Sequence, residues 1–219
     1  MIKAVLFDLD GTICNSLGDL AASVNFTLEK LGFKTHEVEA FKYFVGNGIP
    51  KMIERALPEG HKTQEDINKA LEIFLPYYKE HSSDLTQKYD GIAELLTELK
   101  ERNIKIAVCT NKAEPLAKEV VKSFYGDIFD LVFGQREGIP AKPDPTLAKL
   151  LMKELKVEAQ ECIFMGDSGV DVQTAVNSGA VAVGVLWGFR EITELNENGA
   201  EFVIEKPSDL LNLIDALNS

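Results

Sequence analysis

The sequence predicts an α/β fold, in which a parallel sheet is covered by helices on both faces and an all-helical segment follows the first strand. Along most of the 219 residues, short apolar, β-branched runs alternate with amphipathic stretches at helical spacing. The apolar runs are continuous and do not alternate with polar residues, which is typical of strands buried on both faces of a parallel sheet. Between residues 16 and 83 the alternation stops and only helical patterns remain.

The predicted strands are the apolar runs at residues 4–7, 104–109, 131–133, 162–165, 181–186 and 202–204. Leucine and valine residues recur at helical spacing between them, which predicts helices over 92–99, 116–124, 147–155 and 172–176. In open sheets of this Rossmann-like kind, ligands bind outside the carboxyl ends of the strands. We therefore expect the functional residues to follow the strands directly.

The segment without strands is expected to form a helical cap. Ser16 is a suitable N-cap and Gly32 a suitable C-terminal stop for its first helix. A helical block inserted after the first strand would cover the carboxyl end of that strand. The core would then be discontinuous, with residues 1–15 and 84–219 in the α/β core and residues 16–83 in the cap.

Composition excludes some classes of partner. Acidic residues outnumber basic ones, 35 to 23, and the formal net charge is −12. Such a chain is not expected to bind nucleic acid or an anionic membrane, whereas a locally positive pocket for a small anionic substrate is compatible with this net charge.

No apolar run approaches the roughly 18–20 residues of a membrane span. Three widely spaced cysteines fit a reducing cytoplasm, and the sequence does not predict an oligomeric state.

Polar residues gather at the expected strand ends. The first strand runs into Asp8 and Asp10, and the next ends in Thr110 and Asn111. Three further candidates lie beside a helix start and after the 162–165 strand: Lys142, Asp167 and Asp171. The predicted topology brings four carboxylates, a threonine, an asparagine and a lysine together at one edge of the sheet.

Such a cluster restricts the chemistry. Two unit charges about 4 Å apart repel by roughly 4 kcal/mol at an effective dielectric of 20, so the carboxylates require a cation or raised pKa values. Oxygen ligands beside a phosphate favour Mg²⁺. A carboxylate can attack phosphorus, and a second carboxyl two residues away can protonate the leaving oxygen and then activate water. Thr110 and Lys142 can hold the phosphoryl oxygens that do not react.

Four segments in order, FDLDGT, CTN, KPDP and GDSGVD, resemble the motifs of the haloacid dehalogenase-like hydrolases and span nearly the whole chain. The resemblance implies Asp8 as the nucleophile and Asp10 as the general acid/base, with Thr110, Asn111 and Lys142 in the phosphate site. It implies Mg²⁺ held by the Asp8 carboxylate, the main-chain carbonyl of Asp10 and Asp167. Asp171 would be a ligand through water or an orienting partner for Lys142.

The acid at position 10 is similar to that of the phosphatases of this superfamily, whereas the dehalogenases lack it. Three cap segments resemble the phosphoglycolate phosphatase group: 44–48, 53–57 and 77–81. Asn15 departs from that group, where aspartate is usual. In the cap, the turn Gly46-Asn47-Gly48 precedes a proline-marked helix start, whose unpaired N–H groups would favour a carboxylate. The best candidate substrate is therefore 2-phosphoglycolate, a small anionic phosphate ester.

Other functions fit the same motifs. An inorganic pyrophosphatase and a β-phosphoglucomutase share the core and cap, because the motifs act on the phosphoryl group common to all three. From a different class, a phospho-accepting signalling module also phosphorylates an aspartate at a strand end. A cap of this length and a second acid at Asp10 favour turnover over a long-lived phosphoryl mark.

Overall fold

The computed structural model of the protein describes residues 1–219, which divide into two units. Unit 1 contains Met1–Cys14 and Lys88–Ser219, and unit 2 contains Asn15–Gln87. The chain passes between them at β2 (Cys14–Asn15) and β3 (Gln87–Lys88), which pair as a two-stranded sheet. None of the helices is both long enough and apolar enough to span a membrane.

A six-stranded sheet of order β5-β4-β1-β6-β7-β8 forms the centre of unit 1, and all its paired strands are parallel. The strands are β1 (Ala4–Phe7), β4 (Lys105–Ala113), β5 (Leu131–Gln135), β6 (Cys162–Gly166), β7 (Val181–Val185) and β8 (Phe202–Ile204). The predicted parallel α/β fold is confirmed. Its strands form where the sequence has continuous apolar runs, since both faces of the sheet are buried.

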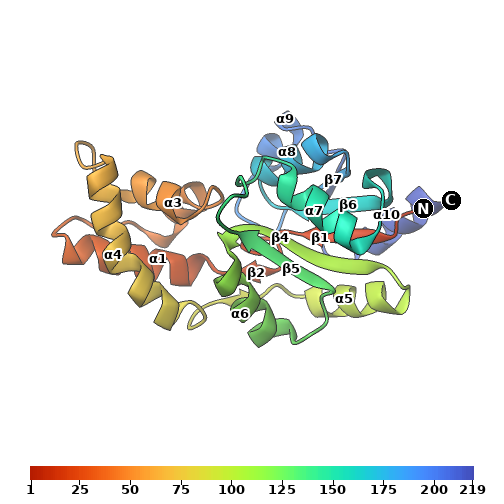
Figure 1. Ribbon diagram of the computed structural model, residues 1–219, viewed down its shortest axis with the longest axis horizontal. Coiled ribbons are helices and arrows are strands. Elements are labelled where there is room, and N and C mark those ends of the chain that lie inside the picture. The colour runs from red at the N-terminus through yellow and green to blue at the C-terminus, as the bar shows by residue number, and fades with distance from the viewer. The chain divides into compact units, whose positions relative to one another are not determined.

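Successive residues of β1 point to opposite faces of the sheet and enter separate hydrophobic clusters. Val5 and Phe7 pack in the cluster that also contains residues of α5, α6 and α10. Ala4 and Leu6 pack in the other cluster, with residues of α7, α8 and α9. Helices therefore cover both faces (Figure 1). They are α5 (Ile92–Glu101), α6 (Glu114–Tyr125), α7 (Thr146–Leu155), α8 (Gly169–Ser178), α9 (Ile192–Glu197) and α10 (Asp209–Asn218), with a 3₁₀ turn at Ala159–Glu161.

Unit 2 is helical throughout, apart from its share of β2 and β3. It contains α1 (Leu17–Lys30), a 3₁₀ turn (Val38–Ala40), α2 (Phe41–Phe44), α3 (Ile49–Ala56) and α4 (Gln64–His81). α1 and α4 pack on each other through Phe26 and Tyr77, whose rings stack with centroids 3.9 Å apart. Gly32 has φ +78°, an angle that residues with a side chain rarely adopt, and the chain leaves α1 there. Ser16 precedes α1 as predicted, but its side chain makes no capping hydrogen bond.

Candidate active site

β1 lies between β4 and β6, the position where the strand order reverses direction along the sheet. Phe7 is paired with Val108 on one side and with Met165 on the other, and the Asp8 N–H donates to the Met165 carbonyl at 3.0 Å. Asp8 therefore emerges at the carboxyl end of the central strand. In open α/β sheets this switch point is where ligands bind.

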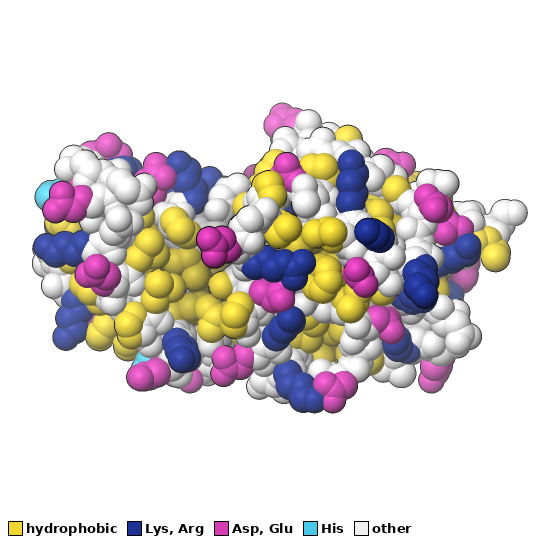
Figure 2. Space-filling view, in the orientation of Figure 1, with side chains coloured by type: hydrophobic (Ala, Val, Ile, Leu, Met, Phe, Trp, Pro, Cys, Tyr) yellow, Lys and Arg dark blue, Asp and Glu magenta, His cyan; other side chains and the backbone are white.

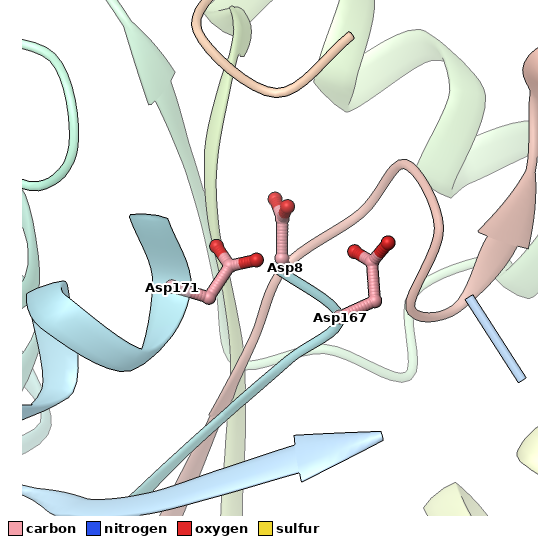
Figure 3. A group of neighbouring side chains, drawn as sticks. All are labelled: Asp8, Asp167 and Asp171. Atoms are coloured by element: carbon pink, nitrogen blue, oxygen red, sulfur yellow. The ribbon is translucent and has the colours of Figure 1, made fainter. Parts of the chain in front are cut away.

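Three carboxylates meet at this point: those of Asp8, Asp167 and Asp171. All three residues are buried, and one oxygen of each lies within 4.8 Å of the others. Asp8 follows β1, Asp167 follows β6 and Asp171 lies in the first turn of α8, with Asp8 between the other two in Figure 3. These three predicted residues are brought together by the fold.

The pKa of Asp8 is raised to about 7, first by burial and then by the nearby carboxylate of Asp171, while the Lys142 ammonium acts to lower it. Burial and the charges of Asp171 and Asp8 likewise raise the pKa of Asp167 well above its ordinary value. Both shifts have the same physical cause, because crowded carboxylates in a dry site resist ionisation. A divalent cation or protons must compensate this charge.

The donor set fits a hard divalent cation. The oxygens are carboxylates, which Mg²⁺ prefers. Asp8 Oδ1 is buried, and the nearest cation to it is the Lys142 ammonium, whose Nζ lies 2.9 Å away. Asp167 is oriented from both sides: its Oδ1 accepts from Thr12 Oγ1 at 3.2 Å and its Oδ2 from the Phe189 N–H at 2.8 Å. Such fixed carboxylates are typical of metal ligands.

Lys142 lies in the loop before α7 and its side chain is 1% exposed. Its Nζ donates to Asp171 Oδ1 at 2.6 Å. Burial alone would lower the pKa of Lys142, but Asp171 and Asp8 together raise it above its ordinary value, so the side chain stays charged. Asp171 Oδ2 accepts from the Ser168 N–H and hydroxyl, at 3.1 and 2.6 Å. Asp171 is thus held as a partner of Lys142.

Asn111 fixes the backbone of the lysine loop. Its Oδ1 accepts from the Lys142 N–H at 2.8 Å, and its Nδ2 donates to the Lys142 carbonyl at 3.1 Å. These two bonds direct the amide of Asn111 toward Lys142. Thr110 is buried on β4, and its hydroxyl oxygen accepts a hydrogen bond from the Lys112 N–H at 3.2 Å. The hydroxyl can still donate its own hydrogen to a phosphoryl oxygen.

Lys112 is a site residue that the sequence reasoning missed. Its Nζ lies 3.0 and 3.2 Å from the two carboxylate oxygens of Asp10, and its side chain is 3% exposed. The available signal was its position two residues after Thr110, at the end of a strand whose other terminal residues had been singled out. The predicted acid/base therefore lies against a buried cation.

The site also depends on the absence of side chains at two glycines. A Cβ on Gly188 would lie 2.2 Å from the Asp167 Cβ and 2.5 Å from the Gly11 carbonyl. A Cβ on Gly11, where φ is +88°, would lie 2.4 Å from Asp167 Oδ2. The neighbouring Trp187 donates its indole N–H to the Thr12 carbonyl at 2.9 Å. This loop after β7, absent from the predicted site, encloses the Asp167 carboxylate.

The positive charge near the carboxylates is internal. Basic and acidic side chains are interspersed over the face shown in Figure 2, whereas the side chains of Lys112 and Lys142 are 3% and 1% exposed. The cationic groups that could contact an anionic substrate in this acidic protein are therefore these two lysines.

The predicted cap residues lie in unit 2. Gly48 precedes α3 with φ +83°, and Pro50 is in the first turn of that helix. Asn47 Oδ1 accepts from Arg55 Nη2 at 2.8 Å, and Arg55 Nη1 donates to the Phe44 carbonyl at 2.9 Å. Arg55 therefore braces the turn at residues 46–48. Lys51 forms an exposed ion pair with Glu54 at 2.8 Å.

Asn15, where aspartate was expected, is exposed at the end of β2. Its Oδ1 lies 3.4 Å from the Leu17 N–H and accepts its hydrogen bond. An aspartate could accept the same bond, so this substitution leaves the local contact in place.

Comparisons with known proteins identify the family of this chain. Residues 5–185 match the family model described as haloacid dehalogenase-like hydrolase. The chain is 34% identical over 203 residues to a phosphoglycolate phosphatase of Neisseria meningitidis, covering 91% of this chain and 86% of that protein. It is 30% identical over 215 residues to a phosphoglycolate phosphatase of Aquifex aeolicus, covering 98% and 97%. A crystal structure from Lactobacillus delbrueckii subsp. bulgaricus, provisionally described as a phosphoglycolate phosphatase, superposes with a TM-score of 0.92 at 32% identity, covering 97% of this chain and 98% of that chain.

Proposed function

Because the chain belongs to the haloacid dehalogenase-like hydrolase family, we propose that it is a Mg²⁺-dependent phosphatase that hydrolyses 2-phosphoglycolate to glycolate and phosphate. The observation that carries the reaction type is the position of Asp8, buried at the switch point of the sheet with Lys142 Nζ 2.9 Å from its carboxylate. The names of the relatives support the choice of substrate.

Asp8 attacks phosphorus and forms an aspartyl phosphate, while Asp10 gives a proton to the leaving alkoxide oxygen. Asp10 then removes a proton from the water that hydrolyses the acyl phosphate. Lys142 donates to a phosphoryl oxygen from its position beside Asp8, and the Thr110 hydroxyl donates to another. Asn111 contributes by fixing the Lys142 backbone. The phosphoryl oxygens thereby keep fixed donors through both steps.

Asp8, Asp167 and the main-chain carbonyl of Asp10 would hold Mg²⁺, and Asp171 would orient Lys142. Bound Mg²⁺ supplies Lewis-acid charge that offsets the repulsion between the substrate dianion and the carboxylates.

We further propose that unit 2 contributes to the choice of substrate through the turn Gly46-Asn47-Gly48. The braced turn leaves N–H groups at the start of α3, which favour an anionic group. Gly48→Ala should therefore reduce turnover of 2-phosphoglycolate more than that of p-nitrophenyl phosphate.

The deciding experiment is a comparison of kcat/KM for 2-phosphoglycolate, pyrophosphate, β-glucose 1-phosphate and p-nitrophenyl phosphate, each with Mg²⁺ and with EDTA. We expect 2-phosphoglycolate to be hydrolysed best and every reaction to stop with EDTA. A higher kcat/KM for pyrophosphate would show that pyrophosphate is the preferred substrate, and the proposed mechanism would still stand. A stable phosphoprotein without steady phosphate release would instead indicate a signalling module.

A further inference from the structure

Lys112 is a buried cation beside Asp10, the residue proposed as the general acid/base. Its ammonium lies 3.0 and 3.2 Å from the carboxylate oxygens of Asp10, and its side chain is 3% exposed. Its N–H donates to the Thr110 hydroxyl at 3.2 Å, and its carbonyl lies 2.5 Å from the place that a Cβ on Gly134 would occupy. The end of β4 thus places the ammonium of Lys112 against the carboxylate of Asp10.

We propose that Lys112 binds the carboxylate of the substrate and is a specificity-determining residue of the core. This inference rests on the proposed function, since it takes Asp10 as the acid that protonates the leaving oxygen. To do so, an Asp10 oxygen must come within about 2.6–3.2 Å of that oxygen. The Lys112 ammonium, in contact with the same carboxylate, then lies within about 6 Å of the leaving oxygen.

The geometry of 2-phosphoglycolate matches this separation. One methylene joins the leaving oxygen to the carboxylate, so the carboxylate carbon lies about 2.5 Å from that oxygen. The carboxylate oxygens extend about 1.2 Å further and come within hydrogen-bonding reach of an ammonium at Lys112. An ammonium carries three tetrahedrally arranged donors, so it can contact Asp10 and a substrate carboxylate together. A neutral ester would gain nothing from this contact.

The two buried lysines would then serve opposite ends of the substrate. Lys142 contacts Asp8 and Asp171, on the side where phosphorus is attacked. Lys112 contacts Asp10, on the side where the alcohol leaves. Both belong to unit 1, as do Asp8 and Asp10. Lys112 would therefore contact the carboxylate from unit 1, in addition to the contribution proposed for the turn in unit 2.

The test compares 2-phosphoglycolate with ethyl phosphate, which lacks the carboxylate. We expect Lys112→Met to lower kcat/KM for 2-phosphoglycolate on the order of 10–100-fold more than for ethyl phosphate, the range expected for one charge-assisted hydrogen bond. Lys112→Arg, which keeps the charge, should restore part of the preference. Lys105→Met is the matched control, because Lys105 lies at the opposite end of β4 and donates to the Leu155 carbonyl. The Lys105→Met variant should prefer 2-phosphoglycolate over ethyl phosphate as strongly as the wild type does.

A binding measurement covers the case in which Lys112→Met abolishes turnover. 3-Phosphonopropionate resembles 2-phosphoglycolate with a methylene in place of the ester oxygen, and propylphosphonate lacks its carboxylate. Calorimetric titration with Mg²⁺ present should show that the wild type prefers 3-phosphonopropionate and that Lys112→Met loses this preference. Thermal unfolding of each variant, with and without Mg²⁺, checks that the site still assembles.

The outcomes separate the two proposals. If the wild type prefers 2-phosphoglycolate and Lys112→Met lowers both substrates equally, Lys112 only positions Asp10 and the inference is overturned. An unchanged preference and unchanged rates in Lys112→Met overturn it as well. If the wild type itself does not distinguish 2-phosphoglycolate from ethyl phosphate, the proposed substrate is wrong and the inference falls with it.

Discussion

At the scale of single residues, the site is organised by two buried cations, each matched to particular carboxylates. Lys142 is paired with Asp8 and Asp171, and Lys112 is paired with Asp10. A buried charge that loses its partner is strongly destabilising, because desolvation is then not offset. The same pairs keep the carboxylates in fixed positions before substrate binds, so that little reorganisation is needed during the reaction.

The two aspartates of the first motif should respond differently to the same substitution. Asp8→Asn should remove turnover completely, because an amide is a poor nucleophile. Asp10→Asn should lower kcat by about 10²–10⁴-fold, the usual contribution of a general acid/base. Rapid quenching with radiolabelled substrate, followed by peptide mapping, should locate the phosphoryl group on Asp8. Label on any other residue would contradict the assignment.

Gly188 should be needed for the position of the Asp167 carboxylate. Gly188→Ala places a Cβ 2.2 Å from the Asp167 Cβ, so the carboxylate must move. We expect Mg²⁺ affinity to fall about 10–100-fold, as for other changes beside metal ligands, measured from the Mg²⁺ dependence of activity. Gly138→Ala is the control, since its Cβ would have no atom within 4 Å and only its φ of +78° adds strain. Equal Mg²⁺ dependence in both variants would contradict this role.

The residues that were not predicted have one thing in common. Lys112 meets Asp10 because β1 and β4 pair in the register Phe7 to Val108, and Gly188 meets Asp167 because the loop after β7 turns back. Both contacts join segments that only the folded chain brings together, so the motif positions alone do not show which of these side chains touch. The residues named in advance each lay in a segment whose pattern could be compared with a known motif.

At the scale of elements, the strands were predictable and the last helices were not. Each strand of the main sheet contains a continuous apolar run, which is a strong signal for a buried strand. β4 extends to Ala113, beyond the predicted end at residue 109, because the polar residues of its carboxyl end are buried in the site and not in solvent. α9 is short, and α10 buries only Leu210 and Ile214, so neither gives a long amphipathic pattern.

Asp19, in the first turn of α1, joins the beginning and the end of unit 2. Its buried carboxylate accepts the Leu85 N–H at 2.8 Å, and the Thr86 N–H and hydroxyl at 2.8 and 2.5 Å. Asp19→Ala leaves these donors without that acceptor and should cost about 1–3 kcal/mol of unfolding free energy. Urea unfolding measures the loss. Glu29→Ala, at an exposed position of the same helix, should stay within about 0.5 kcal/mol of the wild type. Equal stability of the two variants would exclude this role for Asp19.

At the scale of the whole molecule, the parallel sheet is what makes the site possible. Thr12 and Asp167 are separated by 155 residues and are hydrogen-bonded, because β1 and β6 are neighbours. The topology places acidic residues from distant parts of the chain in one buried cluster. The cluster opposes folding unless its charge is compensated. Protonation of its carboxylates and binding of Mg²⁺ should therefore both affect the stability of the protein.

Mg²⁺ should therefore stabilise the protein more at pH 8 than at pH 5. The folded-state pKa of Asp8 is raised from an ordinary 3.8 to about 7, and that of Asp167 is also raised. Between about pH 4 and 7 the folded state without metal binds more protons than the unfolded state, so stability falls as pH rises through this window. Below about pH 4 the carboxyls are protonated in the folded and in the unfolded state, and protonated carboxyls bind metal poorly.

At pH 8 and [Mg²⁺] 100-fold above Kd, binding should contribute about 2.7 kcal/mol, or roughly 5–10 °C in Tm for a chain of this size. At pH 5 the shift should nearly vanish, because metal binding must first displace protons from Asp8 and Asp167. Differential scanning fluorimetry with Mg²⁺ and with EDTA at both pH values measures the difference. Asp167→Asn, which preserves shape but removes a charged ligand, is the control and should show little shift at either pH. A shift of equal size at pH 5 and pH 8 in the wild type, or one that survives in Asp167→Asn, would place the bound Mg²⁺ away from this cluster.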